Sequence, residues 1–158
     1  MTQIANPFKI EPVTDGNFEK VIPLIGQYQK FYRQVPDEAR NRRFFGQFVG
    51  GHHPQATLFL ALGDRGEAVG FATLYFLPSS LTARTVCMLN DLYTVPEARG
   101  KGIARSLVEH CRDHGRRRGF SSLDWQTEQS NSSAQRLYDK LGASRSSWYY
   151  YSLPSGTA

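Results

Sequence analysis

Glycines at positions 100 and 102 connect a β-prone run to an amphipathic helix, and this junction restricts the fold of the 158-residue chain more than any other feature. The run within Leu81–Val95 ends at Pro96, and the helix predicted over Ile103–Gly115 carries its apolar residues on one face. Glycines at such a junction let the backbone pass close to a ligand. The pattern therefore predicts a strand, a ligand-binding loop and a helix in direct succession.

The rest of the chain shows the periodicities of further strands and helices, without internal repeats or a long linker. The expected elements, in order, are a strand at Phe8–Val13, a helix from Asn17 to Tyr32, a second helix from Asp37 to about Val49, strands at Thr57–Leu62 and Ala68–Leu77 joined by a hairpin turn, a short strand at Ser122–Gln126, a helix at Ser132–Leu141 stopped by Gly142, and an aromatic strand at Trp148–Leu153. This order predicts a mixed α/β fold with one layer of sheet and helices on its faces.

Length and composition are those of one ordinary globular domain, which we expect to span residues 1–158. With 40% hydrophobic residues the chain can bury a core, and its longest apolar stretches are far too short to span a bilayer. The start of the sequence has no secretory signal pattern, and two cysteines are too few for a disulfide framework. The cytoplasm is the expected location, without membrane attachment.

The net charge of +5 gathers around the glycine junction, with eight Lys or Arg against four Asp or Glu between Arg84 and Phe120. Backbone amides of residues 100–105 would point out of the helix N-terminus, where the helix dipole favours an anion. The side chains of Arg99, Lys101 and Arg105 add positive charge beside them. A pyrophosphate is the expected occupant, although the motif is neither a Walker loop nor a Rossmann fingerprint.

Two motifs, in matching order and spacing, carry a family resemblance. The run RGKGIA at residues 99–104 resembles the Arg/Gln-x-x-Gly-x-Gly/Ala signature of the GNAT superfamily of acetyl-CoA-dependent N-acetyltransferases. The run NSSAQRLYDKLGA at residues 131–143 resembles the Asn-x-x-Ala-x-x-Leu-Tyr helix of that family, and residues 124–127 resemble its histone/polyamine and diamine acetyltransferase branch. The resemblance implies a mixed, mainly antiparallel sheet with a splayed central strand pair and helices on both faces.

The resemblance also implies an activity and the residues that perform it. The activity is the transfer of an acetyl group from acetyl-CoA to a primary amine of a small molecule, by direct attack, with Tyr138 as the general acid that protonates the departing thiolate. A homodimer is also implied. The residues themselves predict no metal, because the two cysteines lack metal-ligand spacing with the histidines. Cosubstrate binding is assigned to groups on the central strand, the glycine loop and the second motif: Leu92, Tyr93, Thr94, Val95, Arg99, Gly100, Lys101, Gly102, Ile103, Ala104, Arg105 and Asn131.

The general base is not assigned by the resemblance, because Asn90 stands where the diamine branch carries a glutamate. Asp91 is adjacent, but neighbouring side chains on a regular strand face opposite sides of the sheet. The base is therefore Asp91 across a β-bulge, a carboxylate elsewhere such as Asp124 or Glu128, or water.

The acceptor also stays open between amino acids, diamines and polyamines. Residues 17–55, which wall the acceptor site in this family, carry six Lys or Arg against three acidic residues, whereas a polycation would prefer an acidic groove. This charge favours an amine that also carries a carboxylate. The alternatives are acetylation of a protein lysine or N-terminus, or a domain that binds acyl-CoA as a sensor without turnover. Nucleic-acid binding is disfavoured.

Overall fold

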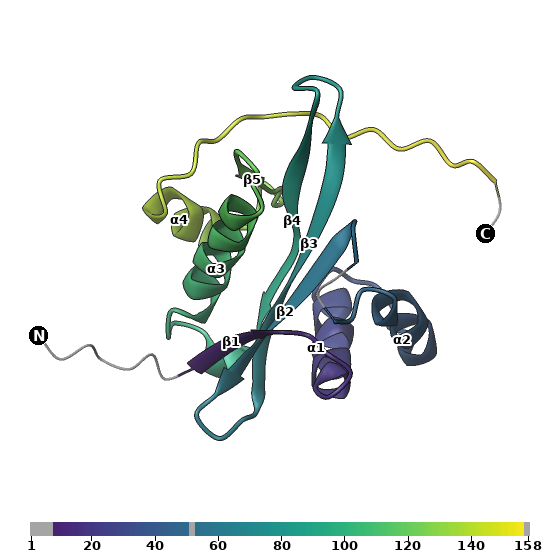
Figure 1. Ribbon diagram of the computed structural model, residues 1–158, viewed down its shortest axis with the longest axis vertical. Helices are drawn as coiled ribbons and strands as arrows, with labels where there is room; N and C mark the ends of the chain where they lie inside the picture. The colour runs from purple at the N-terminus through teal and green to yellow at the C-terminus, as the bar shows by residue number, and fades with distance from the viewer. Residues whose placement is uncertain (1–7, 51–52, 157–158) are drawn as a thin grey trace, which may run out of the picture. The chain divides into compact units, whose positions relative to one another are not determined.

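The computed structural model of the protein describes residues 8–50 and 53–156. Within them the elements are, in chain order, β1 (Phe8–Pro12), α1 (Phe18–Phe31), α2 (Glu38–Gly46), β2 (Ala56–Gly63), β3 (Ala68–Ser79), β4 (Arg84–Thr94), the short 3₁₀ helix η1 (Pro96–Ala98), α3 (Ile103–Arg117), β5 (Leu123–Asp124) and α4 (Ser132–Lys140). The chain divides into two compact units, the first ending at Gln126 and the second beginning at Thr127. The first unit holds the sheet, with α1 and α2 on one face and α3 on the other (Figure 1).

The sheet has the strand order β1-β2-β3-β4-β5, and its neighbours are antiparallel except for the parallel pair β4 and β5. That parallel pair consists of only two residue matches, Cys87 with Leu123 and Met88 with Asp124. Beyond Met88, β4 continues to Thr94 with no pairing to β5 among the described residues. The mixed sheet with a splayed central pair, expected from the sequence, is confirmed.

A one-residue bulge interrupts β4 at Asn90. Thr73 of β3 lies opposite Asp91, whereas the next residue of β3, Leu74, lies opposite Leu89, so that Asn90 has no partner in the register. Because side chains alternate along a strand, one extra residue moves every later side chain to the opposite face. The bulge therefore turns Asp91 away from the α3 face, on which Leu89 lies, and toward α1.

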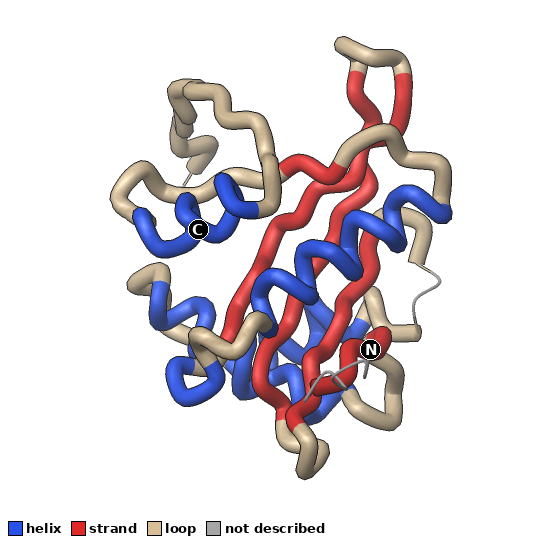
Figure 2. Tube along the Cα trace, turned by 90° about the vertical axis from the view of Figure 1, so that its left-hand side faces the viewer, coloured by secondary structure: helices blue, strands red, loops and turns tan. Residues whose placement is uncertain are grey.

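Each face of the sheet is covered by a separate apolar core. On the α1 and α2 side the core includes Val21, Ile25 and Phe45 from the helices, packed with Phe71 and Tyr93 from the strands. The other side is covered by α3, which Figure 2 shows running across the strands on the face toward the viewer. The buried residues of α3 are Ile103, Leu107, Val108, Cys111 and Gly115.

Close packing between α3 and the sheet depends on a glycine of β3. A Cβ atom at Gly70 would lie 2.7 Å from the carbonyl oxygen of Tyr93 and 3.4 Å from side-chain atoms of both Ile103 and Leu107. Contacts of 2.7 Å to a backbone atom are too short for a Cβ, so only glycine fits here without movement of β4. Gly70 therefore lets β3, β4 and the first turns of α3 approach one another closely.

Most of the expected elements are present, and α2 is shorter than expected. The side chain of Asp37 caps α2 by accepting a hydrogen bond from the backbone N–H of Arg40, at 2.9 Å. The helix ends at Gly46 rather than near Val49, because the next residues form tighter i→i+3 bonds, with Phe48 N–H donating to the Phe45 carbonyl. No helix of the described residues has the length and apolarity needed to cross a bilayer.

The prediction of an aromatic strand at Trp148–Leu153 is wrong. These residues form no strand, and the side chains of Trp148, Tyr149, Tyr150, Tyr151 and Leu153 are 86–92% exposed. Aromatic residues favour strands because they fit a half-buried pleated surface, and the sequence pattern alone does not supply the neighbouring strand that creates such a surface.

Candidate active site

The glycine loop between β4 and α3 has an open backbone with free amides. Gly100 and Gly102 have φ values of 77° and 84°, in the left-handed region that favours glycine, and no atom would lie within 4 Å of a Cβ at either position. The first α3 amide with a helical acceptor is that of Ser106, which donates to the Gly102 carbonyl at 3.0 Å. The amides of the first α3 turn therefore point out of the helix without intrahelical partners, as an anion site requires.

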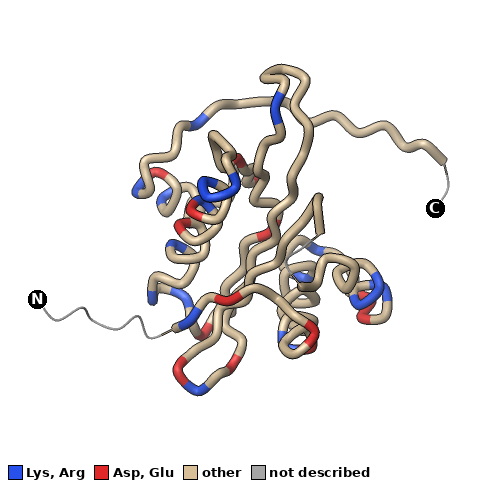
Figure 3. The backbone as a smooth tube through the Cα atoms, in the orientation of Figure 1, with Lys and Arg blue, Asp and Glu red and all other residues tan. Residues whose placement is uncertain are grey.

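Basic side chains surround this loop. Arg99 is anchored by a hydrogen bond from its Nε to the Thr94 carbonyl, at 3.1 Å, and its guanidinium lies 6.0 Å and 5.9 Å from the ring centroids of Phe31 and Tyr93. Lys101 is exposed beside it. Figure 3 shows Lys and Arg residues gathered at both ends of α3. The loop thus combines free amides with positive charge, which fits the diphosphate of a coenzyme A thioester.

The strand before the loop offers backbone groups for the rest of such a ligand. Residues 92–94 of β4 pair with β3 on one edge, and their other edge has no strand partner in the described part of the chain. An unpaired strand edge presents N–H and C=O groups that a ligand with amide bonds can satisfy. Leu92–Val95 is therefore suited to bind the amide-containing arm of acetyl-CoA.

Asp91 is the buried carboxylate of this region, with 5% of its surface exposed. Burial raises the pKa of its carboxyl group, and neighbouring donors from Thr73, Tyr28 and Asn90 oppose that shift. The Asn90 amide donates to Asp91 Oδ1 at 3.1 Å. The Thr73 hydroxyl is buried and forms no hydrogen bond of standard geometry, although it is near enough to lower the pKa of Asp91.

Two tyrosines, Tyr28 and Tyr75, lie near Asp91 on the α1 face. The Tyr28 ring lies 5.0 Å from Tyr32 and 6.4 Å from Tyr93, measured between centroids, and the Tyr93 hydroxyl donates to Gln27 Oε1 at 3.2 Å. Burial and the nearby Asp91 raise the pKa of Tyr28 well above its usual range, and they raise the pKa of Tyr75 to about 12. Both phenols therefore stay protonated at neutral pH and can act as hydrogen-bond donors.

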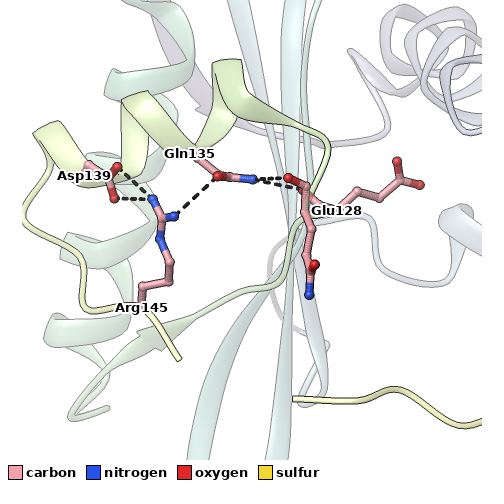
Figure 4. Close-up of polar contacts among 5 residues, drawn as sticks. Glu128, Gln135, Asp139 and Arg145 are labelled. Carbon is pink, nitrogen blue, oxygen red and sulfur yellow. Dashed lines mark hydrogen bonds and ion pairs between the residues drawn. The ribbon is translucent and has the colours of Figure 1, made fainter. Parts of the chain in front are cut away.

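In the second unit, α4 carries the second motif. The Asn131 side chain caps the helix by accepting a hydrogen bond from the Ala134 N–H at 3.2 Å, and Gly142, with φ 76°, follows its end. Figure 4 shows Gln135 donating to the backbone carbonyl of Glu128, at 3.3 Å, and Arg145 bound to Asp139. Tyr138 lies on the same helix, half-buried. These polar contacts fix the motif residues within their own unit.

The structure thus places the expected site residues in two groups. Residues 92–105 lie in the first unit and include the strand edge and the glycine loop, whereas Asn131 and Tyr138 lie in the second. The sequence pattern did not single out Tyr28, Thr73 or Tyr75. Tyr28 lies at helical spacing with apolar core residues of α1, so no local signal separates it from a core aromatic. Within the described residues no group of three His, Cys, Asp or Glu is placed to hold a metal ion.

Solved structures place this architecture in a known class of proteins. A probable acetyltransferase superimposes on the chain with a TM-score of 0.82 and 27% sequence identity, over 95% of this chain and 99% of that one. The fold is therefore that of an acetyltransferase.

The acetyltransferase (GNAT) family matches residues 23–143, and the chain belongs to this family. It is an acetyl-CoA-dependent N-acetyltransferase of EC class 2.3.1. The expectation of this enzyme class from the two sequence motifs is confirmed.

Relatives of known name resemble the chain over most of its length. It is 34% identical to the uncharacterized N-acetyltransferase YhfO of Bacillus subtilis (strain 168), over 77% of this chain and 80% of YhfO. It is 31% identical to the D-amino-acid N-acetyltransferase HPA3 of Saccharomyces cerevisiae, over 84% of this chain and 80% of HPA3. It is 32% identical to the thialysine N-epsilon-acetyltransferase of Sus scrofa, over 81% of this chain and 77% of that enzyme.

Proposed function

We propose that this enzyme transfers the acetyl group of acetyl-CoA to the primary amine of a small molecule that also carries a carboxylate, such as an amino acid. The observation that carries the proposal is the charge on α1 and α2. Arg42 binds both Glu19, at 2.7 Å, and Glu38, at 2.5 Å, so two of the three acidic residues between 17 and 55 are already paired. The remaining excess of Lys and Arg favours an acceptor with a negative group.

The named relatives support an acceptor of this kind. HPA3 acts on D-amino acids and the pig enzyme on thialysine, according to their names. A polyamine would bring several positive charges to helices that are already basic, and like charges weaken binding. Diamines and polyamines are therefore the weaker acceptors in this proposal.

The chemistry requires a neutral amine, a polarised thioester and a protonated leaving group. Gly100–Arg105 would hold the cosubstrate diphosphate, and Leu92–Val95 and Asn131 are assigned to its amide arm by the family resemblance. Tyr138 would give its hydroxyl proton to the departing thiolate. The amine attacks the thioester directly, so no covalent enzyme intermediate forms and neither cysteine is needed as a nucleophile.

Acetyl-CoA-dependent thiol release, measured over a panel of amino acids, diamines, polyamines and basic peptides, tests this function. Turnover should be highest with one or more amino acids and at least tenfold lower in Tyr138→Phe, a barrier increase of about 1.4 kcal/mol. Tyr149→Phe, which changes an exposed tyrosine of the same unit, is the matched control and should retain full activity. A preference for spermine over every amino acid would overturn the proposed acceptor, and turnover of peptides alone would indicate a protein substrate.

We also propose that the chain acts as one GNAT domain over residues 1–158, as a homodimer, in the cytoplasm. The family resemblance supports the dimer, and the two buried cysteines, which are not disulfide-bonded, are compatible with a reducing compartment. Sedimentation equilibrium of the full chain tests the dimer, because a mass of one chain at micromolar concentration would contradict it.

A further inference from the structure

We propose that the guanidinium of Arg99 binds the carboxylate of the acceptor and so distinguishes amino acids from amines that lack a carboxylate. The inference rests on the proposed function, because it assumes an acceptor that carries both an amine and a carboxylate. It concerns the outer Nη groups of the Arg99 side chain, whereas the assignment of Arg99 to the cosubstrate follows from its place in the glycine loop. The charge on α1 and α2 supplies a general attraction for an acid, and Arg99 supplies the contact.

The direction of the Arg99 side chain is the first observation. Its backbone N–H donates to the Pro96 carbonyl at 3.2 Å, and its Nε donates to the Thr94 carbonyl at 3.1 Å. The guanidinium carbon lies 6.0 Å from the ring centroid of Phe31, the last residue of α1, and 5.9 Å from that of Tyr93. Tyr93 belongs to the core between the sheet and α1. The charge of Arg99 is therefore placed on the side of the sheet that α1 and α2 cover.

The same contacts hold the guanidinium in place and leave its outer edge open. A guanidinium carries donors on Nε and on both Nη groups, and the Thr94 carbonyl uses the one on Nε. Within the part of the chain that the structure describes, Arg99 forms no ion pair and neither Nη group donates a hydrogen bond. The residue is exposed, so that a ligand can reach it. A carboxylate can bind both Nη groups at once, and little side-chain entropy is lost because the rings already restrict the group.

The two other cations of the glycine loop are placed differently. Arg105 Nε lies 3.0 Å from Glu109 Oε1, one turn further along α3, so its charge is already paired. Lys101 is exposed in the loop itself, close in sequence to the amides of the first α3 turn. Those amides and Lys101 supply donors and positive charge for a diphosphate. Arg99, directed toward α1, is therefore the cation of this motif that suits a second anion.

The cations of α1 and α2 include some that are already engaged. Lys20 donates to a backbone carbonyl in the turn between β2 and β3, at 2.9 Å. Arg42 is bound by two glutamates of these helices. Lys30 and Arg33 flank Phe31 in the sequence and are exposed, so they are the competitors of Arg99 for an acid at this end of α1.

Arg33 also offers a competitor that can be removed without harm to the fold. It follows the end of α1 with a φ of 60°, in the left-handed region. Its N–H donates to the Lys30 carbonyl, and the Gln34 N–H donates to the Gln29 carbonyl, both at 2.9 Å. This is the Schellman pattern, in which glycine is the usual residue at the left-handed position. Arg33→Gly therefore removes a cation and suits the backbone, so the variant should fold at least as stably as the wild type.

The position of Arg99 also fits the path of the acceptor. Arg99 is anchored on Thr94, a residue of the β4 segment whose other edge has no strand partner among the described residues. That edge is suited to the amide arm of acetyl-CoA. An acceptor whose carboxylate lies at Arg99 is therefore bound beside the strand that would carry the thioester, which is the neighbourhood that the attacking amine has to enter.

The test compares the best amino acid of the panel with the amine that it gives on loss of its carboxyl group. The measured quantity is the ratio of kcat/KM for these two acceptors, because a defect in acetyl-CoA binding lowers both values and cancels in the ratio. The wild-type enzyme should prefer the amino acid. Arg99→Gln keeps a donor for the Thr94 carbonyl and lacks the Nη groups. It should lower the ratio by about 10- to 100-fold, as expected for hydrogen bonds to a charged group.

Four further variants separate the Arg99 contact from general charge. Arg99→Lys keeps the charge without the planar fork and should lower the ratio by a smaller factor. Lys101→Gln, the matched control, removes the neighbouring cation of the loop and should leave the ratio within about threefold of the wild-type value. Arg33→Gly and Lys30→Gln remove the competing cations and should also leave it within about threefold. Thermal unfolding with and without coenzyme A verifies that each variant is folded and binds the cosubstrate.

The outcomes that overturn the inference differ from those that overturn the proposed function. A wild-type ratio in Arg99→Gln would contradict the role of Arg99, and so would a collapse of the ratio in Arg33→Gly or Lys30→Gln alone. An equal loss with both acceptors, with a raised KM for acetyl-CoA, would assign the side chain to the cosubstrate instead. A wild-type enzyme that does not prefer the amino acid would contradict the proposed function, and the inference with it, before any variant is made.

Discussion

The two faces of the central sheet bury different chemistry. On the α3 face the buried side chains are apolar groups and thiols, such as Leu107 and Cys111 with no exposed surface at either residue, together with the neutral hydroxyls of Thr57 and Thr94. On the α1 and α2 face the buried set includes Thr73 and Asp91 and is bordered by the hydroxyl of Tyr28. A carboxylate is far more costly to bury than a hydroxyl, so the presence of Asp91 on one face indicates a functional requirement there.

The two faces therefore contribute differently to the candidate site. The α3 face fixes the helix whose N-terminus presents the glycine loop, and close packing is its contribution. The α1 face presents a carboxylate and phenols, and its contribution is a defined electrostatic environment. The two faces should therefore respond differently to substitutions that add a methyl group or change the polarity of a buried side chain.

Gly70→Ala should produce the largest loss of stability, because its Cβ would lie 2.7 Å from the Tyr93 carbonyl oxygen. Movement of β4 or of α3 is needed to relieve the contact, and we expect the free energy of unfolding to fall by about 1–3 kcal/mol. Urea unfolding followed by circular dichroism measures it. Gly16→Ala is the control, since the nearest atom to its Cβ would be Thr14 Oγ1 at 3.7 Å. Equal stability of the two variants would contradict the packing argument.

Cys111→Ser and Thr73→Val change the polarity of a buried side chain in opposite directions, one on each face. The serine hydroxyl would be buried without a partner on the α3 face, with an expected loss of about 1–2 kcal/mol. The valine removes a hydroxyl that already forms no hydrogen bond of standard geometry, so stability should stay the same or rise slightly. Thermal unfolding of both variants checks the comparison. A larger loss in Thr73→Val than in Cys111→Ser would show that the α1 face depends on that hydroxyl for its packing.

Gly26→Ala in α1 should raise stability, in contrast to Gly70→Ala. Its Cβ would meet only Pro36 carbons, at 3.7 Å or more, which is ordinary van der Waals contact. Alanine also lowers the backbone entropy of the unfolded chain, so we expect a gain of about 0.5–1 kcal/mol. The midpoint of urea unfolding measures the gain. A loss of stability would mean that α1 cannot accept a methyl group beside the α1–α2 connection.

The smallest expected effect is a decline in the free energy of unfolding as pH falls below about 6.5. Burial lowers the pKa of His110 and of His114, whose rings pack 4.6 Å and 5.1 Å from that of Phe59. On acidification the unfolded chain takes up protons before the folded one, which reduces the free energy of unfolding. Urea midpoints at pH 7.5 and 5.5 test this, and His114→Gln should reduce the difference. A stability that rises on acidification over this range would contradict the assignment.

The histidines and the carboxylates with lowered pKa values affect stability in different pH ranges. Glu11 and Asp37 have folded-state pKa values below their ordinary ones, held there by hydrogen bonds from Lys9 and from the Arg40 backbone. Their contribution is present above about pH 4.5 and is lost only at lower pH. Measurements at pH 5.5 and above therefore exclude these two carboxylates, and the histidine effect is measured in Asp91→Asn, because the raised pKa of Asp91 makes a contribution of the opposite sign.

Much of the fold could be predicted from local patterns. The order of strands and helices followed from apolar periodicity, since residues at spacing 3.6 or 2 must cover a common face. The glycine loop followed from Gly100 and Gly102, because their positive φ values and the absence of side chains are local properties. The strand predicted at residues 148–153 is wrong for the opposite reason. Its residues suit a strand, but strand formation depends on a neighbour that the local sequence does not specify.

The sequence by itself therefore determined the family and the glycine loop between β4 and α3, because short motifs encode backbone geometry and local charge. Only the tertiary structure decided which face of β4 carries Asp91. That orientation depends on the register between Thr73 and Asp91 and on the unpaired Asn90 between Asp91 and Leu89. Register is set by pairing between distant segments, and a shift of one residue reverses every side chain that follows.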